Sequence, residues 1–201
     1  MKQKHSAFFA LTAAWGLIFL FAAFTALKPD TYKVDLSQST LSWEGKKLVG
    51  SHKGTVALTS GTLIFNGKTL IEGGFIANMT TIQDADKNSS LEKHLKSDDF
   101  FGVSKYPAAN FIIKKVTGKG TNLNITGDLT IKGVTHAISF PAVLTWNADK
   151  TVTAVAEKIV VDRTKFGIEF RSKSIFSTLG DNFIEDEFTL SVKLLAKPSI
   201  N

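Results

Sequence analysis

Apolar and polar side chains alternate one by one through residues 123–146, and this period of two restricts the segment to β-structure. The apolar residues stand at odd positions as far as Ile131, and after Lys132–Gly133 they stand at even positions as far as Trp146. Each half therefore has one apolar face and one polar face. The short break between the halves predicts an antiparallel hairpin with a tight turn.

The rest of the chain after residue 30 shows similar patterns, separated by turns that contain glycine. Thr, Val, Ile and Phe are frequent between the 15 glycines, and only 4 prolines interrupt them. The Asn66–Gly67 pair is a strong hairpin signal. Further strands are expected over residues 31–36, 40–47, 52–59, 61–66, 68–82, 109–117, 152–162 and 183–196.

One segment departs from the two-residue period. Leu91 and Leu95 recur at helical spacing, and either Asn88 or Ser89 can cap a helix there. Glu92 follows Ser89 by three residues, which is the spacing of a capping box. The sequence therefore predicts one short helix inserted midway among the strands.

Together these elements indicate an all-β domain of about eight antiparallel strands. Long alternating strands in that number favour a closed barrel, because closure removes the exposed sheet edges. A two-sheet sandwich is the alternative. No internal repeat or linker divides residues 28–201, so we expect them to form one domain.

Composition excludes several classes of site. The net charge is +6, but the basic residues are dispersed and only Arg163 and Arg171 are arginines. A nucleic-acid surface would need a clustered basic stripe, so we expect an ordinary solvated surface and no nucleic-acid partner. The chain has no cysteine, which rules out disulfides, thiolate metal sites and a cysteine nucleophile.

Residues 1–27 have the composition of a targeting segment. Lys2 and Lys4 precede a stretch over residues 7–27 that contains no charged residue. As a helix this stretch would span about 31 Å, which matches the hydrocarbon core of a bilayer. The basic end should stay in the cytoplasm, which places residues 28–201 outside the inner membrane.

The fate of this predicted N-terminal apolar helix is open. A cleaved signal peptide usually has an apolar core of about 7 to 15 residues, so the length favours an uncleaved signal anchor. Ala23 and Thr25 supply the small residues for cleavage before Ala26, which keeps a cleaved signal peptide as the alternative. In both cases the domain is exported, either held at the periplasmic side of the inner membrane or free in the periplasm.

The predicted inward face is almost wholly apolar. An eight-stranded barrel has room for side chains or for one slender ligand, and an apolar interior suits a long hydrocarbon better than a sugar or nucleotide. By periodicity alone, a filled core is the more frequent outcome. The residues that we assign to this wall, and therefore to ligand binding, are Val56, Leu58, Phe65, Phe75, Met79, Ile125, Leu129, Ile131, Ile138, Phe140, Leu144, Trp146, Leu190 and Val192.

Short motifs also follow one another along residues 31–196 in a recognisable order. They are residues 32–35 (YKVD), 42–47 (SWEGKK), 50–54 (GSHKG), 94–101 (HLKSDDFF), 105–107 (KYP), 127–135 (GDLTIKGVT) and 162–168 (DRTKFGI). In order and spacing this set resembles the YceI-like family of exported, polyisoprenoid-binding proteins. Any one motif is weak, whereas all of them in order are specific.

The resemblance implies an elongated, lipocalin-like barrel of eight antiparallel strands with a helix near one end. It also implies a long isoprenoid ligand, such as a polyprenyl lipid or the tail of a quinone, held inside the barrel. It brings no catalytic residues and no cofactor beyond such a co-bound lipid. One feature departs from the family: the leader is long enough to remain as an anchor, whereas many relatives are released into the periplasm.

Two polar residues are candidates for contact with a ligand head group. His136 shares a face with Ile138 and Phe140, and Arg163 can form forked bonds to phosphate or carbonyl oxygens. The ordinary alternatives are a hydrogen-bonded core histidine and an ion pair between Arg163 and Asp181 or Glu185. His52 and His94 have no second ligand at metal-binding spacing, so no metal site is expected.

Three functions remain open from the sequence. The first is a non-enzymatic carrier of an isoprenoid lipid. The second is an interaction or stress-response module of the cell envelope with a filled core. The third is a lipid-modifying enzyme, which would need His, Asp or Arg side chains clustered at one end of the barrel.

Overall fold

The hairpin expected over residues 123–146 is present in the computed structural model, which describes residues 28–176 and 182–199. Strand β6 (Asn122–Ile131) pairs in antiparallel register with β7 (Val134–Trp146), and Ile131 lies directly opposite Val134. The turn residues Lys132 and Gly133 both have positive φ, at 52° and 77°. This left-handed backbone matches the twist of the strands, so the turn and the alternating faces specify one register.

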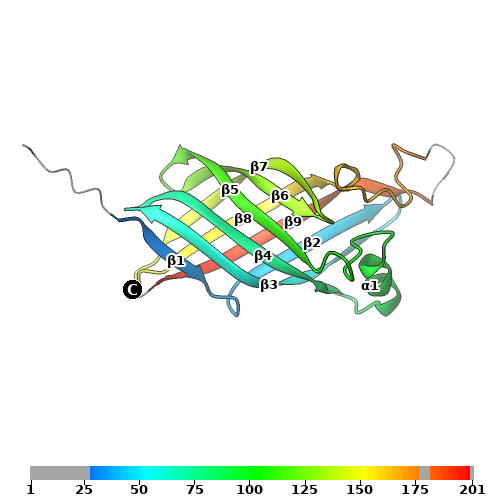
Figure 1. Ribbon diagram of the computed structural model, residues 1–201, viewed down its shortest axis with the longest axis horizontal. Coiled ribbons are helices and arrows are strands. Elements are labelled where there is room, and N and C mark those ends of the chain that lie inside the picture. The colour runs from blue at the N-terminus through cyan, green and yellow to red at the C-terminus, as the bar shows by residue number, and fades with distance from the viewer. Residues whose placement is uncertain (1–27, 177–181, 200–201) are drawn as a thin grey trace, which may run out of the picture.

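The strands close into a barrel in which every pairing is antiparallel (Figure 1). Going round the barrel, the order is β2-β9-β8-β7-β6-β5-β4-β3, and β3 pairs again with β2. Closure excludes the two-sheet sandwich, because no free sheet edge remains for a second layer. The other strands are β1 (Asp30–Val34), β2 (Thr40–Lys47), β3 (Ser51–Asn66), β4 (Thr69–Asp84), β5 (Ala108–Lys119), β8 (Val152–Asp162) and β9 (Ile184–Pro198).

Nine strands fill eight positions because β1 and β2 share one position. Both lie between β3 and β9: β1 pairs with the last part of each, and β2 pairs with the first part of each. The segments expected at 52–59 and 61–66 are likewise one strand, β3, with a register shift between Leu58 and Ser60. The shift moves the inward positions of β3 from even to odd numbers, since Val56 and Leu63 are both buried. The expected eight-stranded antiparallel barrel is therefore confirmed.

The two ends of the barrel differ. Helix α1 (Ser89–Lys96) lies at one end, together with residues 163–176, which follow β8 (Figure 1). Strand β1 and the last residues of β9 lie at the other end. We refer to these as the helix end and the β1 end.

Helix α1 is short, and its start is determined by a single cap. The side chain of Asn88 accepts a hydrogen bond from the Leu91 amide at 3.1 Å, and Leu95 is buried against the core. Glu92 does not complete a capping box. Its carboxylate instead accepts a hydrogen bond from the Asp84 amide at 3.0 Å, which ties the helix to the end of β4.

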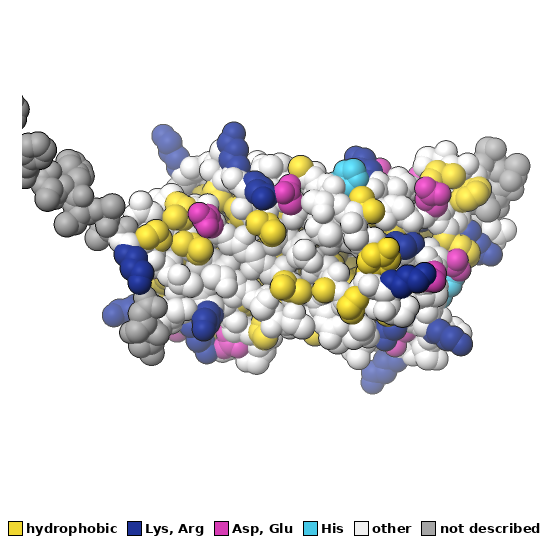
Figure 2. Space-filling model, in the orientation of Figure 1, with side chains coloured by type: hydrophobic (Ala, Val, Ile, Leu, Met, Phe, Trp, Pro, Cys, Tyr) yellow, Lys and Arg dark blue, Asp and Glu magenta, His cyan; other side chains and the backbone are white. Residues whose placement is uncertain are grey.

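The N-terminal apolar helix expected within residues 1–27 lies outside the described residues. Within residues 28–176 and 182–199, no helix combines the length and apolar character needed to cross a bilayer. On the face seen in Figure 2, basic and acidic side chains are interspersed over the surface.

The two glycines on the inward face of the β2–β3 hairpin provide a stability test. A Cβ at Gly54 would lie 1.8 Å from the Gln83 carbonyl oxygen and 2.8 Å from the Trp43 ring, whereas a Cβ at Gly45 would meet nothing within 4 Å. We expect Gly54→Ala to lower the free energy of unfolding by at least about 2 kcal/mol, because backbone must move to relieve the overlap. Gly45→Ala should leave stability unchanged or slightly raised. Urea unfolding of both variants makes the comparison, and equal stability would contradict the close approach.

Candidate functional site: the barrel interior

The barrel encloses a cavity of about 190 Å³. This is far more than the roughly 10–15 Å³ that one buried water molecule needs. Side chains from all eight barrel positions line it, and nearly all of them are apolar. An apolar cavity of this kind does not hold ordered water well, because water there would lack hydrogen-bond partners. The interior is therefore suited to a hydrocarbon.

The structure places most of the predicted wall residues on this cavity. Those that line it are Val56, Leu58, Phe75, Met79, Ile125, Leu129, Ile131, Ile138, Phe140, Leu144, Leu190 and Val192. Phe65 and Trp146 do not line it. They pack against each other beyond the end of the cavity, with ring centroids 5.0 Å apart.

Several wall residues were not in the predicted set. Leu41, Trp43 and Leu63 line the cavity from β2 and β3. The alternation in those strands could have found them, although the shift in β3 hides the position of Leu63. Phe100 and Phe101 also line the cavity, but they follow α1 in a coil segment, where no periodicity indicates which way a side chain points.

Aromatic rings cover the helix end of the cavity. The ring of Phe100 lies 5.0 Å from that of His94 and 5.7 Å from that of Phe170, and the His94 and Phe170 rings are 4.6 Å apart. These rings come from α1, from the coil after it and from the segment after β8. The cover is therefore built by loops and one short helix, whereas the barrel wall is built by paired strands.

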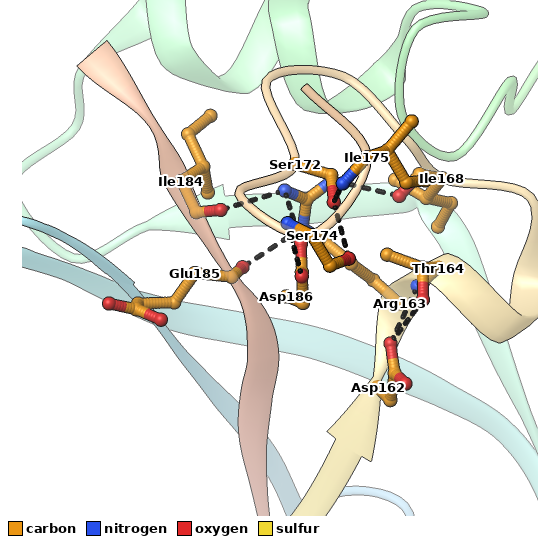
Figure 3. A network of polar contacts seen from close by, with 10 residues as sticks. All are labelled: Asp162, Arg163, Thr164, Ile168, Ser172, Ser174, Ile175, Ile184, Glu185 and Asp186. Atoms are coloured by element: carbon orange, nitrogen blue, oxygen red, sulfur yellow. Dashed lines mark hydrogen bonds and ion pairs between the residues drawn. The ribbon is translucent and has the colours of Figure 1, made fainter. Parts of the chain in front are cut away.

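Arg163 is buried at the helix end and lines the cavity, with only 4% of its surface exposed. It belongs to the 3-10 turn η1 (Arg163–Phe166) directly after β8. Its guanidinium group donates to three main-chain carbonyl oxygens and pairs with a carboxylate (Figure 3). The acceptors are Glu185 O at 3.0 Å, Ile168 O at 2.8 Å and Ile184 O at 2.9 Å, with Asp186 Oδ1 at 3.6 Å.

These contacts assign Arg163 a structural role. Its partners come from residues 167–176, which follow η1 and which we call the strap, and from the start of β9. One side chain therefore joins two segments that are separated in sequence. The ion pair forms with Asp186, whereas Glu185 contributes only its main-chain oxygen. Asp181, the other partner considered from the sequence, lies outside the described residues.

The environment of Asp186 keeps it ionised. Burial raises the pKa of Asp186. Hydrogen bonds from Ser172 and Ser174 and the charge of Arg163 lower this pKa by more, so it lies below its usual value. The Ser174 amide donates to Asp186 Oδ2 at 3.2 Å. The carboxylate is therefore part of the network that holds the strap.

Each histidine of the body has a separate partner. His136 does not line the cavity; its Nε2 lies 2.8 Å from Lys165 O, and its ring meets Phe166 edge-on. His52 Nδ1 lies 3.6 Å from Asp84 Oδ1, and His94 packs on phenylalanine rings. Within the described part of the chain, no group of three His, Asp or Glu residues is arranged to hold a metal ion.

The β1 end of the cavity is apolar and closed by strands. Its walls carry a set of leucines from five strands: Leu63, Leu70, Leu123, Leu144 and Leu194. Beyond them, the rings of Tyr32, Phe65 and Trp146 meet edge-on at centroid distances of 5.0 to 5.6 Å. We call these three rings the aromatic floor.

Comparison with known sequences identifies the family. A closed antiparallel barrel with an apolar interior and one end covered by loops is the architecture of small hydrophobic-ligand carriers. Residues 32–196 match the YceI-like domain, so the chain belongs to the YceI-like family. This confirms the resemblance seen in the sequence motifs.

Individual curated relatives match only part of the chain. A UPF0312 protein from Shewanella denitrificans is 36% identical over 83 residues, or 41% of this chain and 44% of that protein. Protein YceI from Escherichia coli O157:H7 is 34% identical over 96 residues, or 48% of this chain and 50% of that protein. The matched regions thus span about half the length of these curated relatives.

Solved structures share the fold at low sequence identity. BcnA from Burkholderia cenocepacia superposes with a TM-score of 0.69 at 20% identity, covering 82% of this chain and 99% of that one. A polyisoprenoid binding domain from Saccharophagus degradans has a TM-score of 0.67 at 13% identity, covering 84% of this chain and 98% of that one. At these identities the similarity establishes the barrel fold and no more.

The structural role of Arg163 can be tested by stability. Arg163→Leu leaves three carbonyl oxygens and the Asp186 carboxylate without their partner, so we expect a loss of about 3–5 kcal/mol in the free energy of unfolding. Lys165→Ala removes a neighbouring cation whose exposed pair with Asp162 is 4.0 Å long, and it should cost at most about 1 kcal/mol. Urea unfolding compares the two variants. A small effect of Arg163→Leu would show that the strap is held by other contacts.

Asp186 should make stability depend on pH in the acid range. Because its pKa is lowered in the folded protein, its interactions stabilise the fold above the unfolded value of about 3.9 and are lost as the pH falls through the lower native value. Between about pH 5 and pH 3, the unfolding free energy of the wild type should therefore fall more steeply than that of Asp186→Asn. Urea unfolding at a series of pH values gives both slopes, and parallel slopes would refute the assignment.

Proposed function

We propose that this protein binds a long isoprenoid lipid, such as a polyprenyl lipid or the tail of a quinone, in its interior and does not alter it chemically. The observation that carries the proposal is the apolar cavity, which extends from the cover at the helix end to the leucines of the β1 end. The polyisoprenoid binding domain with the same fold supports this ligand class. Membership of the YceI-like family favours a binding protein over an enzyme.

The position of the few polar residues on the cavity favours one direction for a bound lipid. Among the described residues that line the cavity, the polar or charged ones are Asn110, Arg163, Glu185 and Glu187. Asn110 lies near the start of β5, Arg163 directly follows β8, and both glutamates lie at the start of β9, so all belong to the helix end. A polar head group would be costly to bury without partners at the apolar β1 end. We therefore propose that the head group lies at the helix end and that the tail points toward the aromatic floor.

Burial of the tail supplies the binding energy. About ten buried CH₂ equivalents yield on the order of 8 kcal/mol before the costs of association. Arg163 contributes little to head-group binding directly, because its donors are largely used by main-chain carbonyls. Affinity should accordingly depend on the length and fit of the hydrocarbon.

The N-terminal segment also bears on where in the cell the protein would bind its ligand. The uncharged segment over residues 7–27 supports export across the inner membrane, with the barrel on the periplasmic side. Whether anchored or released, the protein would meet isoprenoid lipids at the outer leaflet of that membrane. Two rival functions are less well supported. The cavity argues against a filled-core interaction module. The Arg163–Asp186 pair at the helix end holds main-chain segments together, and the histidines of the described residues each serve a separate contact, which argues against a lipid-modifying enzyme.

Lipid occupancy tests the function. Protein purified under native conditions should release an isoprenoid lipid into an organic extract, identified by mass spectrometry. Leu129 lines the cavity, so Leu129→Trp should lower the lipid-to-protein ratio by about fivefold to a hundredfold, through overlap that costs about 1–3 kcal/mol.

Ala137→Trp is the matched control. Ala137 is exposed on the outer face of the neighbouring strand β7, so the same new side chain adds bulk outside the barrel. This variant should keep wild-type occupancy, and far-UV circular dichroism should show both variants folded. Repeated native preparations that yield an empty wild-type barrel would refute the proposed function.

A further inference from the structure

We infer that the aromatic floor formed by Tyr32, Phe65 and Trp146 is a ruler that sets the longest isoprenoid chain the barrel accepts. The inference rests on the proposed function and deepens it, because it assigns chain-length selection to three residues that do not line the cavity.

The floor blocks the path that the tail would follow. Phe65 is fully buried at 0% exposure and Tyr32 at 8%, and each of the three rings contacts the other two edge-on. The cavity wall ends at Leu144, two residues before Trp146 on the same face of β7. The tail of a lipid entering from the helix end would therefore meet the leucines first and then the three rings.

The floor is also rigid, which a ruler requires. Each ring is carried by a strand whose partners hold it in register: Asp30 lies opposite Phe65, Leu63 opposite Tyr32, and Val152 opposite Trp146. The cover at the helix end, in contrast, is carried by loops and α1. Displacing the paired strands to admit a longer tail would cost packing energy. The excess hydrocarbon would instead have to remain at the helix end, where it is less buried.

One of the three floor rings comes from the short strand β1. It occupies only the part of the eighth barrel position that β2 leaves free, next to the ends of β3 and β9. Tyr32 is thus supplied by a five-residue strand whose inward side chain completes the ring cluster. Chain-length selection would then depend on a short segment separate from the long strands that form the wall.

The test uses free polyprenols of graded length, offered as a mixture in detergent to delipidated full-length protein. Bound lengths are read by mass spectrometry of the extract. Trp146→Ala should shift the preferred chain upward by about one isoprene unit, since the two strand residues from Trp146 to Leu144 advance about 6.6 Å.

A second variant tests the opposite direction, which keeps the inference falsifiable if the enlarged barrel does not fold. Ala142 lines the cavity two residues before Leu144, so Ala142→Phe should shift the preferred chain downward. Val143→Phe is the matched control, because Val143 is 46% exposed on the outer face of the same strand. It should keep the wild-type length profile.

The outcomes separate the two proposals. Opposite shifts for Trp146→Ala and Ala142→Phe, with an unchanged Val143→Phe control, support the ruler. Wild-type protein that takes up no polyprenol of any length overturns the proposed function. Wild-type binding with the same length profile in every folded variant overturns the ruler and leaves lipid binding intact.

Discussion

The closed ladder of main-chain hydrogen bonds allows this protein to enclose a cavity at its centre. Each barrel position pairs with two neighbours, with β2 between β3 and β9 and β4 between β3 and β5. The backbone is therefore satisfied by its own neighbours, and the side chains need not meet across the centre to hold the strands together. An unfilled cavity of about 190 Å³ forgoes packing energy on the order of 5 kcal/mol, at about 24 cal/mol per Å³. A hydrocarbon ligand would recover that energy.

The two ends of the barrel differ because one is closed by paired strands and the other is covered by connecting segments. At the β1 end, tight pairing and three interlocked rings continue the strand architecture to its limit. At the helix end, α1 and the strap after η1 lie over the opening. Buried Arg163 holds the strap to β9 through main-chain oxygens. The closed end is thus made of strands and the covered end of loops, which gives the interior a natural direction for a molecule with one polar end.

Arg163 shows why a charged residue that lines an apolar cavity need not be a binding residue. An unpaired guanidinium in an apolar interior would be costly, so its burial requires several acceptors. The carbonyl oxygens of Ile168, Ile184 and Glu185 meet most of that requirement, and Asp186 balances the charge. These contacts offset the cost of burying the guanidinium group. They also leave few of its N–H donors free for a head group.

The strands, most of their faces and the central hairpin could be predicted from the amino-acid sequence alone. Side-chain alternation and the turn chemistry of Lys132–Gly133 are local properties, and they were sufficient to predict most of the cavity wall. The ordered motifs were sufficient for the family.

Other features depend on contacts between distant parts of the chain, which local sequence patterns do not encode. Periodicity does not distinguish a filled core from a hollow one, because both require the same apolar face. Periodicity also could not show that Phe65 and Trp146 lie in the aromatic floor and not in the cavity wall, because the floor includes Tyr32 from the separate strand β1. It also could not show that β1 and β2 share one position, or that Arg163 reaches across to β9, because these contacts join segments far apart in the chain and exist only once the barrel has closed.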